Sequence, residues 1–384
     1  MTASGADKLS SVADSLDGQR VVLVADATAV LADLTPTAVA LVRAGARVVR
    51  VLDPRPQAAF AEPAFEIPPP IDPGTGAPVT PVQRRSQAEL TDLVRHADLI
   101  VYDVQEPGWR CSATLPALEP VLRAAAVADV GVLVLDRPDP LGALAAAGPL
   151  PLEYLRGVAA PYSVPFRYGL TLGELALLLA SSNRDLDVQV EVLAVDGWDP
   201  GMAWSEAGLP WIPPAADLPT WTAAACLGAG ALGGSLTLAD GRGTGLPYQQ
   251  YGAPGFDGHA LAEALNRIEV PGMRARPTTF NPGSGRHAGF VCQGVQLHVT
   301  DEREFDPFAA GVYLAAFARR LDEERIRWIE VQGVYAIDRV LGSPVFREHI
   351  DDGGDPAKLW RAWRADARAW WHATESHRRY PRPR

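Results

Sequence analysis

VVLVAD at 21–26 is the first of four stretches that decide the fold, and the others are VVRVLD (48–53), LIVYD (99–103) and VLVLD (132–136). Short runs of Val, Leu and Ile without polar alternation predict strands buried on both faces, as in a parallel sheet. In an open parallel sheet, the carboxyl ends of the strands line the ligand crevice. Each run stops on an aspartate, so four side chains predict an acidic rim around a site: Asp26, Asp53, Asp103 and Asp136.

Helical patterns separate these strands, near 36–44, 87–96 and 114–127. The resulting β-α-β-α order predicts an α/β fold with a doubly wound parallel sheet. Thr171 and Glu174 form a capping-box pattern before an apolar helix. We place the end of the first domain after this helix.

The length of 384 residues favours two domains over one. The predicted organisation is a flexible leader at 1–17, an N-terminal domain at 18–184 and a second domain at 185–384. Residues 54–85 are rich in Pro and polar groups, and a loop of that length is typical of a functional or site-covering segment.

In the second half, the Trp- and Pro-rich residues 196–214 and the glycine-rich residues 227–245 are expected to be ordered loops. A strand is predicted at 294–300, and helices at 307–321 and 356–376. The last helix carries apolar side chains at helical spacing, and tryptophans at that spacing are more typical of a core than of a sugar-stacking platform: Leu359, Trp360, Trp363, Ala367 and Trp370.

The bulk composition excludes several classes of protein. A net charge of −11 argues against nucleic acid or an anionic membrane as the partner. No stretch is long enough to span a bilayer, and the first residues lack a signal-peptide pattern, so we expect a cytoplasmic protein. Three scattered cysteines form neither a metal motif nor a disulfide framework. Without a GxGxxG or GxxxxGK[ST] motif after the first strand, we expect no nucleotide cofactor, and no ligand spacing suggests a metal.

Several strings are more specific than this periodicity: VYDVQEPGWR (101–110), LDRPDPLG (135–142), VPFRYGLTLGELA (164–176), GLPWIPP (208–214), DGRGT (240–244), YGAP (251–254) and GVQLHVTD (294–301). In this order they resemble the exo-β-N-acetylmuramidase family of bacterial peptidoglycan hydrolases. The resemblance implies a Rossmann-like N-terminal domain, a smaller α+β domain and an active-site cleft between them. It also implies the removal of N-acetylmuramic acid from the non-reducing end of peptidoglycan fragments, a reaction that ordinarily needs two carboxyl groups.

The chain departs from the family where the chemistry is expected. The family's Pro-Glu-His-Gly, with its candidate catalytic glutamate, reads here as residues 54–57, with Arg55 in the place of the acid. The family's Asn-His-Thr-Gly begins here with Asp26 and Ala27, and a family histidine is Tyr168. An aromatic pair and a Glu-Gly-Thr-Asn string are replaced as well, by Ser112, Thr114 and residues 234–237.

Two hypotheses follow. One is an enzyme with altered chemistry that uses replacement carboxylates, the candidates being Asp26, Asp53, Glu106 and Asp240. The other is a binding or regulatory protein on a glycosidase scaffold. If Arg55 lies beside Asp26 or Asp53, we expect an ion pair in place of the catalytic acid and no cleavage of muramyl glycosides.

The expected partner is a small sugar-type ligand, with a homodimer left open. Its candidate binding residues are Arg55, Asp103, Arg110, Asp136, Arg137, Tyr168, Arg242, Gln296 and His298. Each also has a structural interpretation. The aspartates could cap helices, the arginines could pair with them instead of with a substrate carboxylate, and His298 shares a strand face with Gln296.

Overall fold

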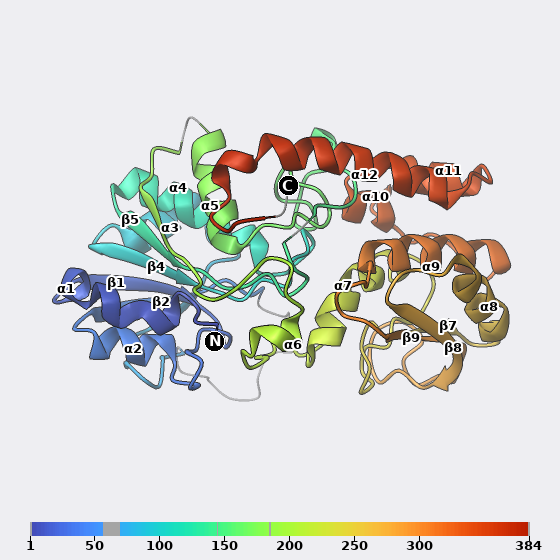
Figure 1. Ribbon diagram of the computed structural model, residues 1–384, viewed down its shortest axis with the longest axis horizontal. Helices are drawn as coiled ribbons and strands as arrows, with labels where there is room; N and C mark the ends of the chain where they lie inside the picture. The colour runs from blue at the N-terminus through green and yellow to red at the C-terminus, as the bar shows by residue number, and fades with distance from the viewer. Residues whose placement is uncertain (1, 57–69, 144, 184–185, 383–384) are drawn as a thin grey trace.

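The computed structural model describes residues 2–56, 70–143, 145–183 and 186–382. It contains an N-terminal α/β domain and a smaller domain, with a long C-terminal helix running across the top of both in Figure 1. Part of the predicted long loop, from residue 57 to residue 69, lies outside the described residues.

The N-terminal domain is built on a six-stranded sheet in the order β3-β2-β1-β4-β5-β6, in which all paired strands are parallel. Its strands are β1 (Arg20–Ala25), β2 (Arg47–Asp53), β3 (Val79–Pro81), β4 (Leu99–Asp103), β5 (Gly131–Leu135) and β6 (Val190–Leu193). The chain order reverses between β1 and β4, which is where open α/β sheets place their ligands. The predicted α/β class is confirmed.

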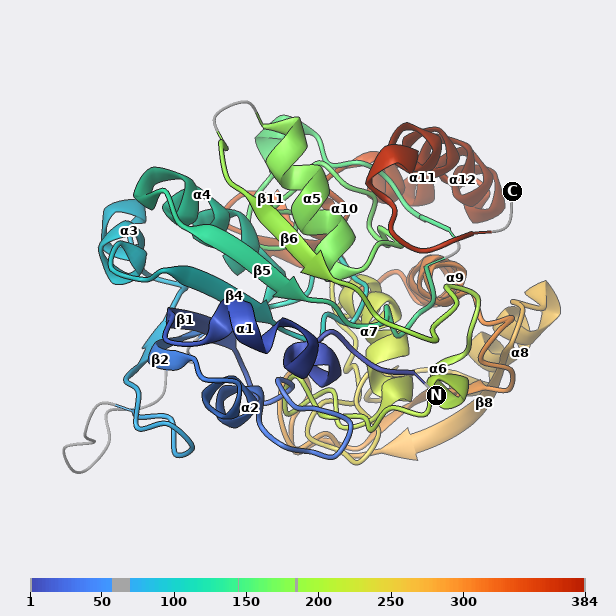
Figure 2. The same cartoon turned by 60° about the vertical axis from the view of Figure 1, so that its left-hand side comes forward.

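Both faces of this sheet are covered (Figure 2). One face packs against α3 (Gln87–Val94), α4 (Leu118–Ala128) and α5 (Leu172–Ser182), and the other packs against α2 (Thr37–Arg43) and the N-terminal segment. Alternate residues of each strand supply the two cores: Val22 and Val24 lie on the first face, and Leu23 on the second.

Two predictions about the domain limits are wrong. The prediction of a flexible leader at 1–17 is wrong for the described residues 2–17, which include η1 (Ala6–Val12) and α1 (Ala13–Leu16). The side chains of Leu9 and Leu16 on these elements are buried against the sheet. The boundary after residue 184 is also wrong, because β6 pairs with β5 and so belongs to the first domain. A strand pattern does not reveal which sheet the strand joins.

The second domain contains α7 (Trp221–Gly233), α8 (Gly258–Ile268) and α9 (Pro307–Leu321) beside an antiparallel sheet in the order β7-β9-β8. These strands are β7 (Gln250–Ala253), β8 (Met273–Phe280) and β9 (Cys292–Val299). The prediction of a loop through the glycine-rich stretch is wrong for α7. Its glycines allow close packing, since a Cβ at Gly228 would lie 2.4 Å from the Trp109 ring and one at Gly230 2.2 Å from the Tyr248 ring.

The remaining helices and strands are distributed over both domains and the segments that connect them. They are η2 (Leu115–Ala117), η3 (Glu153–Leu155), α6 (Trp204–Ala207), β10 (Glu330–Val331), β11 (Val334–Tyr335), α10 (Ala336–Leu341), α11 (Val345–Asp351), α12 (Pro356–Ala373) and η4 (Glu375–His377). The apolar face of α12 packs into the core, with Trp363 against Phe308 and Phe346 at ring distances of 5.8 and 6.1 Å. Trp360 and Trp370 are only half-buried, and Trp371 is buried in their place.

The chain then returns to the first domain. Tyr380 Oη donates a 2.6 Å hydrogen bond to Asp136, and Arg382 forms a buried ion pair with Glu174 at 2.6 Å. Glu174 and Thr171 also make the predicted capping box of α5. In the described part of the chain, no helix is long and apolar enough to cross a bilayer.

Candidate functional site

Asp103, at the end of β4, is neutralised inside the protein. Its carboxylate accepts hydrogen bonds from Arg137 Nε at 2.6 Å and Nη2 at 2.9 Å, and from Thr37 Oγ1 at 2.6 Å. Arg137 also donates to Val30 O at 2.8 Å, and the two paired side chains are 0% and 9% exposed. The prediction that Asp103 and Arg137 bind a ligand is therefore corrected, because each satisfies the other and together they hold the loop after β1 against the sheet.

Asp136, after β5, is also structural. It accepts hydrogen bonds from the backbone N–H of Gly173 at 2.9 Å and from the hydroxyls of Thr171 and Tyr380 at 2.7 and 2.6 Å. Burial raises the pKa of Asp136 to about 6. The carboxylate caps the N-terminus of α5, so its prediction as a ligand-binding group is corrected in favour of the capping interpretation.

Arg110 is likewise fully buried. Its guanidinium donates to four carbonyl oxygens, those of Pro149, Val164, Val340 and Leu341, at 2.7 to 3.1 Å. Burial lowers the pKa of Arg110 to about 9. The predicted substrate-binding role is corrected to a structural one, because these bonds join loops of the first domain to the end of α10.

Arg55 does lie beside the strand-end carboxylates. Its Nε and Nη2 donate to the two oxygens of Asp53 at 3.0 and 2.7 Å, and its backbone N–H donates to the same carboxylate at 2.9 Å. Arg55 is 46% exposed and Asp53 21%, so the pair lies at the open rim of the sheet. The expected ion pair between Arg55 and Asp53 is present.

Asp26 adjoins this pair and has an oxygen to spare. Its Oδ1 accepts from the N–H and hydroxyl of Thr28 at 2.8 and 2.5 Å, whereas its Oδ2 is buried without a hydrogen-bond partner in the described structure. Burial raises the pKa of Asp26, and the nearby charge of Arg55 opposes the shift. Of the four predicted rim carboxylates, Asp26 and Asp53 are the two that reach the rim.

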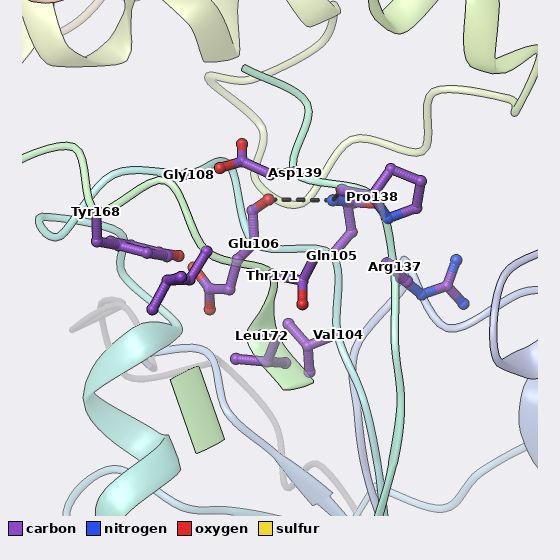
Figure 3. A pocket seen from close by; sticks show the side chains of 11 residues that line it. Val104, Gln105, Glu106, Gly108, Arg137, Pro138, Asp139, Tyr168, Thr171 and Leu172 are labelled. Carbon is purple, nitrogen blue, oxygen red and sulfur yellow. Dashed lines mark hydrogen bonds between the residues drawn. The ribbon is translucent and has the colours of Figure 1, made fainter. Parts of the chain in front are cut away.

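A small enclosed cavity lies beside Glu106, beyond the end of β4 (Figure 3). Glu106 accepts a 2.7 Å hydrogen bond from Thr114 Oγ1, and the hydroxyl of Tyr168 points toward its carboxylate. Three buried polar atoms here have no partner in the described structure: Glu106 Oε2, Asp139 Oδ2 and Tyr168 Oη. The cavity measures about 10 Å³, which is close to the space that one enclosed water needs.

Burial makes both carboxyls of this cavity unusually weak acids. It raises the pKa of Glu106 from 4.5 to about 7 and that of Asp139 from 3.8 to about 7. Gly108 lets Asp139 approach, since its φ is +83° and a Cβ there would lie 2.5 Å from Asp139 Oδ1. Glu106 can therefore hold a proton near neutral pH, which a general acid requires.

The second domain contributes two further polar groups. Asp240 binds the Nε of Arg242 with both oxygens at 3.0 Å. On β9, Gln296 and His298 share a face as predicted, and Arg276 on β8 donates to both, to Gln296 Oε1 at 2.5 Å and to His298 Nε2 at 3.0 Å. Burial and Arg276 together lower the pKa of His298, which favours the neutral imidazole.

The predicted residues thus form two groups. Among the described residues, hydrogen bonds and ion pairs connect Arg55 with Asp53 at the sheet edge and Arg242 with Asp240 in the second domain, and none joins the two groups. Sequence reasoning missed Asp139 and Arg276. Asp139 lies within the family string at 135–142, and Arg276 lies on a strand that the prediction did not include. No three His, Cys, Asp or Glu side chains in the described ranges gather where they could hold a metal ion.

Comparison with known proteins agrees with this architecture. The family model described as exo-beta-N-acetylmuramidase NamZ, N-terminal, matches residues 21–222, and its C-terminal counterpart matches residues 226–380. The peptidoglycan beta-N-acetylmuramidase NamZ of Bacillus subtilis is 28% identical over 283 residues, which cover 74% of this chain and 67% of that protein.

Two crystal structures of DUF1343 family proteins from Bacteroides fragilis share the fold. One is 25% identical, with a TM-score of 0.86 and 99% of each chain covered. The other is 20% identical, with a TM-score of 0.77 and all of each chain covered. With family models matching nearly its full length, the chain belongs to the exo-β-N-acetylmuramidase NamZ family.

Proposed function

We propose that this protein binds a sugar-type ligand in the cleft between its domains and has little or no muramidase activity. The observation that carries the proposal is the ion pair between Arg55 and Asp53 at the end of β2. In the family pattern, a glutamate occupies the position of Arg55 and is the candidate proton donor.

A guanidinium cannot perform that task. Its hydrogen bonds to Asp53 raise the pKa of Arg55 further, so it keeps its protons at every pH at which the protein is folded. Loss of a general acid commonly costs about 10²- to 10⁴-fold in rate. The histidine in the family's Asn-His-Thr-Gly string, after the first strand, is Ala27 here. Removal of two polar groups from one site reduces turnover further.

The polar groups that remain suit recognition of hydroxyls and carboxylates. Arg242 projects from a glycine-flanked loop and is 44% exposed. Arg276, Gln296 and His298 present a joined set of donors and acceptors on one sheet face. The proposal keeps a small sugar as the partner, and light scattering measures whether the chain is a homodimer.

The test is turnover of a chromogenic N-acetylmuramic acid glycoside. We expect wild type to remain at the background rate and the Arg55→Glu, Pro56→His double variant to gain activity. Arg20→Glu is the matched control, because Arg20 forms a similar exposed two-bond pair with Asp98 far from the rim. Substantial turnover by wild type would sink the proposal.

A second candidate is an enzyme with altered chemistry, and Glu106 favours it. A carboxyl with a pKa of about 7 and an unpartnered oxygen has the protonation state of a general acid. Screening other β-glycosides with wild type and Glu106→Gln tests this candidate. A wild-type activity that Glu106→Gln abolishes would establish it, whereas the same activity in both proteins would rule out Glu106 as the acid.

A further inference from the structure

The outward face of α12 carries a stripe of positive charge. Four exposed side chains follow one another along it at intervals of three or four residues: Arg361, Arg364, Arg368 and His372. At a rise of about 1.5 Å per residue, they form one arginine stripe about 16 Å long. The net charge of the chain is −11, so the stripe is a local reversal of the overall charge. We propose that the arginine stripe docks an acidic α-helix of a partner protein, an inference that goes beyond sugar binding and does not depend on it.

The stripe is held on a fixed support. The opposite face of α12 is buried in the protein through Leu359, Trp363, Ala367 and Trp371. Figures 1 and 2 both show α12 at the outer edge of the molecule, with the rest of the chain on one side of it. The arginines are therefore presented to solvent in a fixed row, which lowers the entropic cost of binding a partner.

The charges of the stripe are poorly compensated within the chain. Arg368 makes no ion pair with any residue that the structure describes. Arg364 lies over the ring of Trp360 at 4.8 Å, and Arg361 lies 3.9 Å from Asp355 in a long, exposed pair. The guanidinium groups thus keep donors available for the carboxylates of a partner.

The shape of the surface suits a second helix. A hollow of about 480 Å³ follows the stripe, and the small side chains of Ala365 and Ala369 lie in it between the charged ones. Small residues let the backbone of another helix approach closely. Glutamates or aspartates at intervals of three and four residues form a row on one face of such a helix, and this row has the same spacing as the arginines.

A helix fits the stripe better than an extended anionic surface does. A membrane or a nucleic acid would also meet the acidic remainder of the chain, which repels it. A membrane surface further favours large apolar side chains beside the basic ones, and no large apolar side chain of α12, all of which the structure describes, is exposed. A helix of the stripe's length contacts the positive charges alone, and salt screens charges that lie more than about 8 Å away.

The test uses an alanine-based helical peptide of about 20 residues whose glutamates lie on one face at the spacing of the stripe. The control peptide has the same composition, with its glutamates distributed around the helix. Fluorescence anisotropy of each labelled peptide, titrated with the full chain, measures binding. We expect the one-face peptide to bind about tenfold more tightly, and more weakly as salt is raised.

A charge reversal locates the site. Arg368→Glu should weaken binding of the one-face peptide about tenfold, because an attraction becomes a repulsion, whereas Arg368→Lys should lose less. Glu and Arg have similar helix propensities, so α12 should be retained. Arg43→Glu is the matched control, since Arg43 is exposed at the end of α2, which Figure 1 shows on the opposite side of the molecule from α12.

Three outcomes would overturn the proposal. They are equal binding of the two peptides, no effect of Arg368→Glu, and binding of the chain to anionic phospholipid vesicles without binding of the one-face peptide. Should Arg368→Glu fail to fold by circular dichroism, Arg368→Ala decides the same question, because alanine also favours the helix. None of these results bears on the sugar ligand, so the proposed function is tested separately.

Discussion

Glu106→Gln should make the protein more stable at pH values above about 4 and leave its stability unchanged below that pH. The side chain is buried, with one oxygen bound by Thr114 and the other without a partner in the described structure. A glutamine retains the shape and can still accept from Thr114 through Oε1. It removes the energetic cost of ionising a carboxyl in this enclosed cavity.

The size of the effect follows from the acidity of the group. The pKa of Glu106 rises from 4.5 to about 7 on burial. Between these two values the native state binds more protons than the unfolded chain, so the stability of wild type falls as pH rises through this window. At about 1.4 kcal/mol for each pKa unit, the cost reaches about 3 kcal/mol by pH 8, is about 1 kcal/mol at pH 5 and vanishes below pH 4.

Urea unfolding followed by tryptophan fluorescence at pH 5 and pH 8 measures this difference. We expect Glu106→Gln to gain about 2 kcal/mol more over wild type at pH 8 than at pH 5. Glu119→Gln is the control, since Glu119 pairs with Arg123 at the surface of α4 and should show no such gain. An equal effect at both pH values, or a loss at pH 8, would refute the raised pKa of Glu106.

Three further predictions test the rim and the buried contacts. Arg55→Glu alone should raise the pKa of Asp26 further, because the positive charge that opposes its shift is replaced by a negative one, and carboxylate NMR titration measures this change. Arg137→Met should cost about 3 to 5 kcal/mol in urea unfolding because Asp103 is left buried and unpaired, and a cost below about 1 kcal/mol would contradict this. Tyr380→Phe should cost about 1 to 3 kcal/mol by the same measurement, through the lost bond to Asp136.

The local sequence pattern was sufficient to predict much of the N-terminal domain. The four apolar runs became β1, β2, β4 and β5 because central parallel strands are buried on both faces and leave a pattern that needs no tertiary information. The capping box of Thr171 and Glu174 was likewise predicted from residues that are close in the sequence. The family strings supplied the cleft between two domains, which periodicity alone could not.

The sequence left the roles of the strand-end residues open between ligand binding and a structural role, because these roles depend on distant partners. Asp103 is neutralised by Arg137, 34 positions later, and Asp136 accepts a hydrogen bond from Tyr380, 244 positions later. The glycine-rich α7 was missed for the same reason, since its helix is stabilised by the rings that its glycines admit, such as Trp109 at Gly228. The ion pair of Arg55 could be anticipated because its partner Asp53 is two residues away.

The most direct test of the account is a crystal structure of wild type soaked with an intact N-acetylmuramic acid glycoside. The account predicts that the glycosidic bond remains whole and that the sugar lies between the two domains, with the ion pair of Arg55 and Asp53 preserved. Density for the cleaved sugar would contradict the claim that this member of the family binds without hydrolysis. An empty cleft at saturating ligand would contradict sugar binding itself.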